Sequence, residues 1–190
     1  TIPTSIGNLT ELEQIYLRDN ALVGPIPEEI GNLVKLTNLF LTGNGLSGSL
    51  PSGFTNLVLL ERAYLDGNQI SGSLPSGLGR LTKLGNFNMQ ANQLSGPIPS
   101  DLAGMASLTE LNLSFNDLSG PIPGELGLLP ELRDLNLSEN DLTGPLPAGL
   151  SRASNLRYLD LSFCAIDGNV PASWGDLTNL GFFYADGNKL

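Results

Sequence analysis

The chain repeats itself every 24 residues from one end to the other, without an insertion or a deletion. A proline recurs at this step eight times, a glycine seven times and an asparagine seven times, with Cys164 filling the one missing asparagine position. The recurring asparagines are Asn20, Asn44, Asn68, Asn92, Asn116, Asn140 and Asn188. A fixed period of this length is typical of a stacked solenoid, in which each unit contacts only its neighbours. Function is then expected at the positions that the repeat leaves variable.

Each repeat contains one segment that predicts a strand and another that predicts a turn. In residues 33–56, Leu39 and Leu41 alternate with outward positions, which is the period of a strand. Eight such segments in parallel would give a sheet about 35 Å wide. The residues after Leu50 and Pro51 are too few for an α-helix and predict a short 3₁₀ turn. The expected fold class is an α/β solenoid.

One domain, residues 1–190, is expected to hold seven full units from 9–176 and partial units at 1–8 and 177–190. Solenoids need polar caps over their terminal cores, and no cap is visible in the sequence. We therefore expect a segment of a longer solenoid. Within it, the recurring asparagine should satisfy backbone groups at the turn, since its amide both donates and accepts. Cys164 is interpreted as a structural substitute in this ladder, and Trp174 as a core residue at a repeat position.

Composition argues against several functions. The chain has no histidine, which is the usual general base and the commonest metal ligand, and its single cysteine suggests neither a disulfide nor a metal site. We expect no catalysis, no cofactor and no metal. The net charge of −10 disfavours nucleic acid and anionic membranes as partners. No apolar run is long enough to span a bilayer, so this segment is expected to make no direct membrane contact.

The string LTNLFLTGNGLSGSLPSGFTNL at residues 36–57, and LSGPIP at 94–99 and 118–123, resemble the plant-specific subclass of leucine-rich repeats. The resemblance covers the whole chain. It implies a right-handed superhelical solenoid with a concave parallel β-sheet, a short second sheet and 3₁₀ turns on the convex side. Similar proteins include ectodomains of receptor-like kinases and receptor-like proteins, and polygalacturonase-inhibiting proteins. This chain departs from them in lacking paired-cysteine caps and an island insertion, and in being acidic.

The resemblance implies a protein or peptide partner and an extracellular or cell-surface location, while an organellar or intracellular assembly stays open. A non-catalytic binding module is the first hypothesis. The alternatives are an architectural subunit of a larger assembly and an inhibitor of a secreted polysaccharide-degrading enzyme. Ice binding would require a regular threonine ladder, and the outward columns contain only Thr37, Thr42 and Thr109. The oligomeric state is left open.

Two patches of aromatic and charged side chains flank the predicted strands. Side chains beside the strand leucines should face solvent on the concave side, because residues alternate between the faces of a strand. The N-terminal patch comprises Tyr16, Arg18, Phe40, Arg62 and Tyr64. Aromatic residues beside arginine are typical of binding hot spots, so this patch is the first candidate for partner binding. Cross-strand stacking without a binding role is the structural alternative.

The C-terminal patch comprises Tyr158, Asp160, Phe182 and Tyr184, with Arg157 and Phe163 beside them. Phe182 and Tyr184 could instead serve only to cover a further repeat. The same outward columns contain polar residues that we also expect to face solvent, among them Asn38, Ser114, Ser138 and Ser162.

Three acceptor patterns for N-glycosylation occur, at Asn8, Asn112 and Asn136. The sequence Asn-Leu-Ser also arises from the repeat itself, so these patterns have a structural explanation as well. Attached glycans would indicate a secretory route and would cover part of the central concave face.

Overall fold

The computed structural model describes all residues, 1–190, and confirms the expected solenoid of two parallel sheets and 3₁₀ turns. The larger sheet has eight short strands in sequence order, one from each turn of the solenoid. They are β1 (Gln14–Tyr16), β3 (Asn38–Phe40), β5 (Arg62–Tyr64), β7 (Asn86–Asn88), β9 (Glu110–Asn112), β11 (Asp134–Asn136), β13 (Tyr158–Asp160) and β15 (Phe182–Tyr184). Every residue pairs with the residue 24 positions later, as in Tyr16 with Phe40 and Phe40 with Tyr64. Equivalent side chains therefore form straight columns across this sheet.

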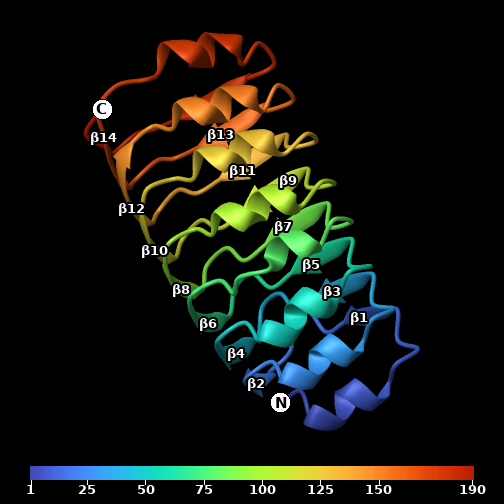
Figure 1. Cartoon of the computed structure of the whole chain (residues 1–190). Helices are drawn as coiled ribbons and strands as arrows, with labels where there is room; N and C mark the ends of the chain where they lie inside the picture. The colour runs from blue at the N-terminus through green and yellow to red at the C-terminus, as the bar shows by residue number, and fades with distance from the viewer.

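A second sheet of seven strands runs along one edge of the stack (Figure 1). Its strands are β2 (Val23–Gly24), β4 (Gly45–Gly48), β6 (Gln69–Gly72), β8 (Gln93–Gly96), β10 (Asp117–Gly120), β12 (Asp141–Pro145) and β14 (Ala165–Asp167). In β4, Leu46 is buried between the half-exposed Gly45 and Ser47. The inner face of this sheet thus closes the core, and its outer face meets solvent.

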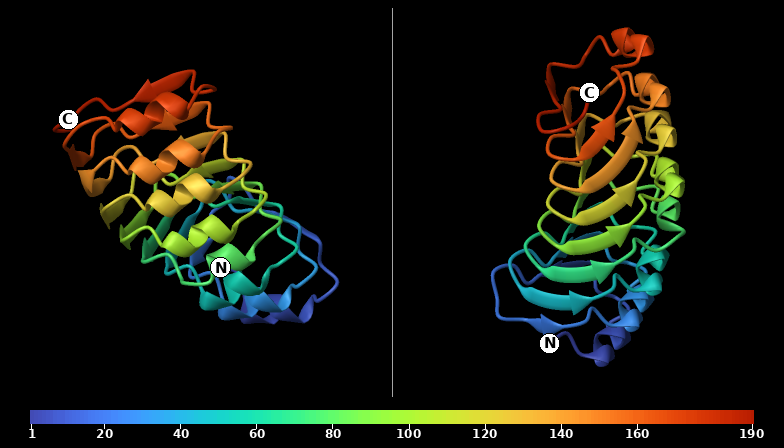
Figure 2. Two further views of the ribbon diagram at one scale, coloured as in Figure 1. Left: turned by 45° about the horizontal axis from the view of Figure 1, so that its top comes forward. Right: turned by 90° about the vertical axis from the view of Figure 1, so that its left-hand side faces the viewer.

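Eight 3₁₀ helices complete the repeats. They are η1 (Thr4–Asn8), η2 (Glu28–Asn32), η3 (Ser52–Asn56), η4 (Leu78–Arg80), η5 (Ser100–Gly104), η6 (Gly124–Leu128), η7 (Ala148–Arg152) and η8 (Ala172–Asp176). The stack is curved, and these helices follow the outside of the curve (Figure 2). Seven of the eight begin directly after a proline, which is the N-cap residue and has an extended backbone. None of the helices has the length and apolar composition that a membrane crossing requires.

The core is one continuous cluster of 46 buried residues. Ala63 lies beside Phe87 in the paired strands β5 and β7, and the Phe87 ring packs 6.2 Å from that of Phe54. A small residue next to a large one keeps the interior filled. Trp174 lies in this core as predicted, only 7% exposed, and its indole Nε1 donates to the Pro147 carbonyl over 3.1 Å.

The asparagine ladder ties successive repeats together. Asn116 donates from Nδ2 to the carbonyls of Met89 and Leu113, both at 3.0 Å, and accepts at Oδ1 from the Leu94 amide at 2.9 Å. Cys164 occupies the same place, with Sγ 3.5 Å from the carbonyl of Leu137. The sequence correctly predicted both features, because backbone groups in a buried turn must find partners.

Candidate functional site

The N-terminal patch forms a stack of three aromatic rings across β1, β3 and β5. The ring centroids of Tyr16 and Phe40 are 4.6 Å apart, and those of Phe40 and Tyr64 are 5.2 Å apart. The interplanar angles are 18° and 15°. The guanidinium of Arg18 lies 4.1 Å from the Phe40 ring centroid and 5.4 Å from that of Tyr64. Arg62 is exposed at the start of β5, on the same face as Tyr64.

The members of this stack differ in exposure. Tyr16 is 58% exposed, whereas Phe40 is only 5% exposed. The expectation that Phe40 faces solvent was therefore wrong, because two neighbouring rings and the Arg18 guanidinium cover it. Burial raises the pKa of the Tyr64 phenol, with a further increase from the Glu110 carboxylate, while Arg62 and Arg18 oppose the shift. Tyr64 thus keeps its proton and can donate a hydrogen bond at neutral pH.

The C-terminal patch is held by hydrogen bonds as well as by rings. The rings of Tyr158 and Tyr184 lie 5.7 Å apart and are tilted by 49°, and that of Phe182 lies 6.4 Å from Tyr158. Tyr158 Oη donates to Asp160 Oδ2 over 3.2 Å, and the Ser162 amide donates to Asp160 Oδ1 over 3.0 Å. Burial raises the pKa of Tyr158, and the Asp160 carboxylate adds to the increase. The four residues predicted for this patch are therefore brought together.

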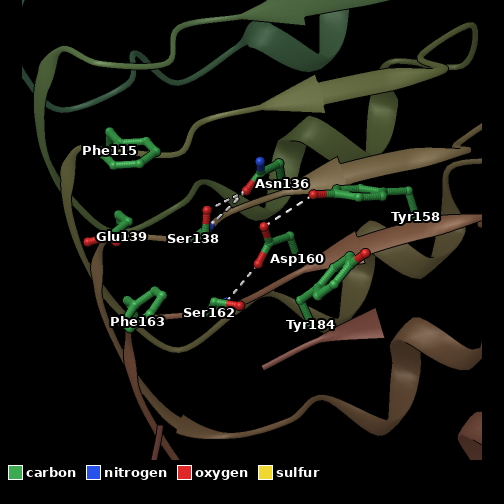
Figure 3. A pocket seen from close by; sticks show the side chains of 9 residues that line it. All are labelled: Phe115, Asn136, Ser138, Glu139, Tyr158, Asp160, Ser162, Phe163 and Tyr184. Atoms are coloured by element: carbon green, nitrogen blue, oxygen red, sulfur yellow. Dashed lines mark hydrogen bonds between the residues drawn. The ribbon is translucent and has the colours of Figure 1, made fainter. Parts of the chain in front are cut away.

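A hollow of about 250 Å³ opens beside this patch (Figure 3). It is lined by Phe115, Asn136, Ser138, Glu139, Tyr158, Asp160, Ser162, Phe163 and Tyr184. Phe182 does not line it. Phe115 and Glu139 were absent from the predicted site, although they occupy the same repeat position as Phe163.

That repeat position has an unusual backbone. Phe115, Glu139 and Phe163 have φ values of 55°, 53° and 54°, in the left-handed region that bulky residues rarely adopt. Three equivalent positions, at 43, 67 and 187, are glycine. An aromatic residue in a column where glycine recurs is a sequence signal that could have identified Phe115.

Several outward positions are buried rather than exposed. Ser114, Ser138 and Ser162 are 0%, 5% and 6% exposed, and Asn38 is 6% exposed. Alternation predicted solvent for all four, which was wrong because neighbours on the same face cover short side chains. The hydroxyl of Ser138 donates to Asn136 Oδ1 over 2.7 Å, so burial leaves it satisfied.

The glycosylation patterns lie in different surroundings. Asn8 is exposed at the end of η1. Asn112 and Asn136 are half-buried, and their Oδ1 atoms accept hydrogen bonds from the amides and hydroxyls of Ser114 and Ser138. Of the three possible glycosylation sites, Asn8 is thus the one whose side chain forms no such hydrogen bond.

The structure contains no group of three or more His, Cys, Asp or Glu side chains placed to hold a metal ion. The concave face instead offers rings, amides, hydroxyls and separate charges. These groups suit non-covalent recognition of a polypeptide.

A family model described as Leucine Rich Repeat matches well over half of the chain, at residues 11–33, 35–57, 59–81, 107–129, 131–153 and 155–177. No curated protein matches the chain. The ectodomain of the plant membrane receptor kinase GASSHO1/SCHENGEN3 from Arabidopsis thaliana was solved in complex with CASPARIAN STRIP INTEGRITY FACTOR 2. It is 34% identical with a TM-score of 0.94, over 98% of this chain and 23% of that chain.

The Arabidopsis receptor kinase HAESA, solved with the peptide hormone IDA and the co-receptor SERK1, is 35% identical with a TM-score of 0.89, over 98% of this chain and 31% of that chain. The chain thus spans less than a third of either receptor structure. A plant ice-binding protein is 29% identical with a TM-score of 0.74, over 98% of this chain and 68% of that chain.

Proposed function

The chain belongs to the leucine-rich repeat family, and we propose that it is a recognition module that binds a protein or peptide on its concave sheet. Structurally similar receptor kinases were solved with bound partners, one of them a peptide hormone, which supports this class of function. We further propose an extracellular or cell-surface location, by analogy with those receptors. The proposed role is binding without catalysis.

The stack of Tyr16, Phe40 and Tyr64 beneath Arg18 is the observation that carries the proposal. Tyrosine and arginine are the residue types in which binding hot spots are enriched. The stack and the guanidinium are already held in place in the free chain. Binding of a partner there would therefore cost little side-chain conformational entropy in this chain.

A displayed library of random peptides, selected on the immobilised chain, tests this function. We expect selected peptides to lose at least about tenfold in affinity for the Arg18→Ala variant, as for a hot-spot residue. Arg80→Ala is the matched control, because Arg80 is an exposed arginine on η4, away from the concave sheet. If Arg80→Ala weakens binding as much as Arg18→Ala, or if no peptide is enriched, the proposal fails.

Ice binding is a second candidate, and one observation favours it. Hydroxyl side chains occupy the same outward position in five consecutive strands of the second sheet, namely Ser47, Ser71, Ser95, Ser119 and Thr143. The strands of this sheet pair with an offset of 22 residues, as in Ser47 with Gln69, so the hydroxyls recur once per repeat in an oblique row that shifts by two residues along each strand. The threonine ladder considered from the sequence concerned the concave face, where no such row exists. The similarity to a plant ice-binding protein supports the candidate.

Inhibition of ice recrystallisation would test this second candidate directly. A Ser95→Asp change interrupts the row at its centre and should abolish the inhibition. Ser100→Asp adds the same charge at an exposed position on η5 and should leave it intact. Ice crystals that coarsen equally with and without the unmodified chain would rule the candidate out.

A further inference from the structure

We propose that the C-terminal hollow binds the guanidinium group of an arginine side chain on the polypeptide partner. The inference deepens the proposed function by naming the chemistry of one partner group, and it rests on that function only in assigning the arginine to a polypeptide. The first strand residue that lines the hollow, Asn136, lies three repeats after Tyr64, the last member of the ring stack. The hollow is therefore a separate binding site on the same sheet.

The charge of the side chains that line the hollow favours a cation. Two carboxylates, Glu139 and Asp160, line the hollow, and none of the nine lining residues is a lysine or arginine. The one ion pair in the chain joins Lys35 to Glu11, so neither carboxylate forms an ion pair with a lysine or arginine of the chain. Residues 96–190 carry 12 acidic and 4 basic side chains (−8), whereas residues 1–95 carry 7 and 5 (−2). The field around the hollow therefore favours a positive group.

The aromatic rings that line the hollow favour a cation that can stack on them. Phe115 and Phe163 stand on one side of the hollow with Glu139 between them, and Tyr158 and Tyr184 stand on the other (Figure 3). A cation placed over aromatic rings is attracted to their faces, and arginine makes such contacts more often than lysine. Its planar guanidinium can also stack on a ring while it donates to a carboxylate in the same plane.

The hydrogen bonds in the hollow orient its acceptors. Asp160 is fixed by Tyr158 Oη at 3.2 Å and by the Ser162 amide at 3.0 Å. Each carboxylate oxygen has two lone pairs, so both oxygens of Asp160 retain an acceptor site. Glu139 is exposed and forms none of the chain's ion pairs. The hollow therefore presents one fixed carboxylate and one adjustable carboxylate.

The continuity of the hollow with the concave sheet favours a polypeptide as the source of the cation. Asn136, Tyr158 and Tyr184 belong to β11, β13 and β15 and face the same side as the ring stack. A partner lying across the sheet would pass the hollow and could insert one side chain.

Three acetylated and amidated pentapeptides serve as probes, each with one central residue between glycines: arginine, its neutral isostere citrulline, or lysine. Their binding is followed by NMR through the ring and amide signals of the chain at low ionic strength. The arginine peptide should shift signals of Phe115, Phe163, Tyr158 and Tyr184. We expect it to bind about fivefold more tightly than the citrulline peptide, given the worth of one cation–π contact with a weak ion pair. It should also bind more tightly than the lysine peptide, because an ammonium cannot stack flat on a ring.

Variants separate this site from general attraction to an acidic protein. Glu139→Gln and Phe163→Gly should each weaken arginine-peptide binding by about threefold. Glu125→Gln is the matched control, since it removes the same charge at an exposed position on η6. Phe163→Gly is expected to fold, because glycine occupies the equivalent positions 43, 67 and 187.

Equal binding of the citrulline peptide, or shifts outside the hollow, would overturn the inference. Equal binding of the lysine peptide would overturn the assignment to a guanidinium. If Glu125→Gln weakens arginine-peptide binding as much as Glu139→Gln does, the assignment of binding to the hollow would be overturned. The library selection on Arg18 concerns the ring stack alone, so either proposal can fail while the other stands.

Discussion

The asparagine ladder gives the sharpest stability prediction, for the change Asn116→Ala in the middle of the solenoid. Asn116 is 8% exposed, and its side chain joins two successive repeats. It donates to Met89 in the repeat before and to Leu113 in its own repeat, and it accepts from Leu94 in the repeat before. Alanine removes all of these bonds and leaves the buried Leu94 amide without an acceptor.

The expected cost follows from these contacts. Each of the three bonds of 3.0 Å or less contributes about 1 kcal/mol net, and an orphaned buried amide adds roughly 1–2 kcal/mol. We therefore expect Asn116→Ala to lower the free energy of unfolding by about 4 kcal/mol.

Urea unfolding followed by circular dichroism measures this cost, and Asn20→Ala is the matched control. Asn20 occupies the same repeat position but is exposed, and it bonds only to carbonyls of its own turn, Leu17 and Arg18. Its loss should cost less than about 1 kcal/mol, because water can replace both bonds. Similar losses in the two variants would refute the reasoning that burial makes the ladder essential.

Three further predictions concern Cys164 and the left-handed column. Cys164→Asn should raise the free energy of unfolding by about 1–2 kcal/mol in urea titrations, since the asparagine amide replaces long sulfur contacts with full hydrogen bonds. A less stable variant would show that this ladder position accommodates sulfur better than an amide. Burial raises the pKa of the Cys164 thiol, and the thiolate is the reactive form. Iodoacetamide should therefore alkylate the folded chain more slowly than the urea-unfolded chain at pH 8. As the pH is raised further, the alkylation rate of the folded chain should still increase where that of the unfolded chain has reached its plateau. Equal pH profiles would contradict this. Phe163→Gly should change stability by less than about 1 kcal/mol, since relief of the left-handed backbone offsets the lost ring contacts. In the same urea titrations Leu161→Ala, which empties a fully buried position, should cost about 3 kcal/mol. A comparable loss in Phe163→Gly would assign that ring a structural role.

The sequence was sufficient for the features that depend on one repeat at a time. The recurring asparagine, the strand leucines and the turn proline each follow from backbone geometry, so their positions could be predicted without coordinates. Cys164 and Trp174 were correctly interpreted as architecture because the repeat assigns them to known slots.

Exposure on the concave face could not be predicted in the same way. Alternation tells which face a side chain occupies, but the next repeats decide whether it is covered. Phe40 is buried by Tyr16, Tyr64 and Arg18, and Ser138 by its neighbours and its bond to Asn136. These are contacts between repeats, which depend on ring orientation and curvature.

The hollow near Asp160 was predicted only in part, for a related reason. Its Phe115 and Glu139 lie outside the strands, on the turn that precedes the ladder asparagine, and the predicted patch took only Phe163 from this repeat position. Their signal was a departure from the repeat, since glycine occupies the same position at 43 and 67.

The central claim is that the concave sheet is the binding face, and an NMR footprint of a library-selected peptide tests it most directly. The account predicts that amide and ring signals of β1, β3 and β5 shift most, including those of Tyr16 and Tyr64. Shifts confined to the 3₁₀ helices or to the outer face of the second sheet would contradict it.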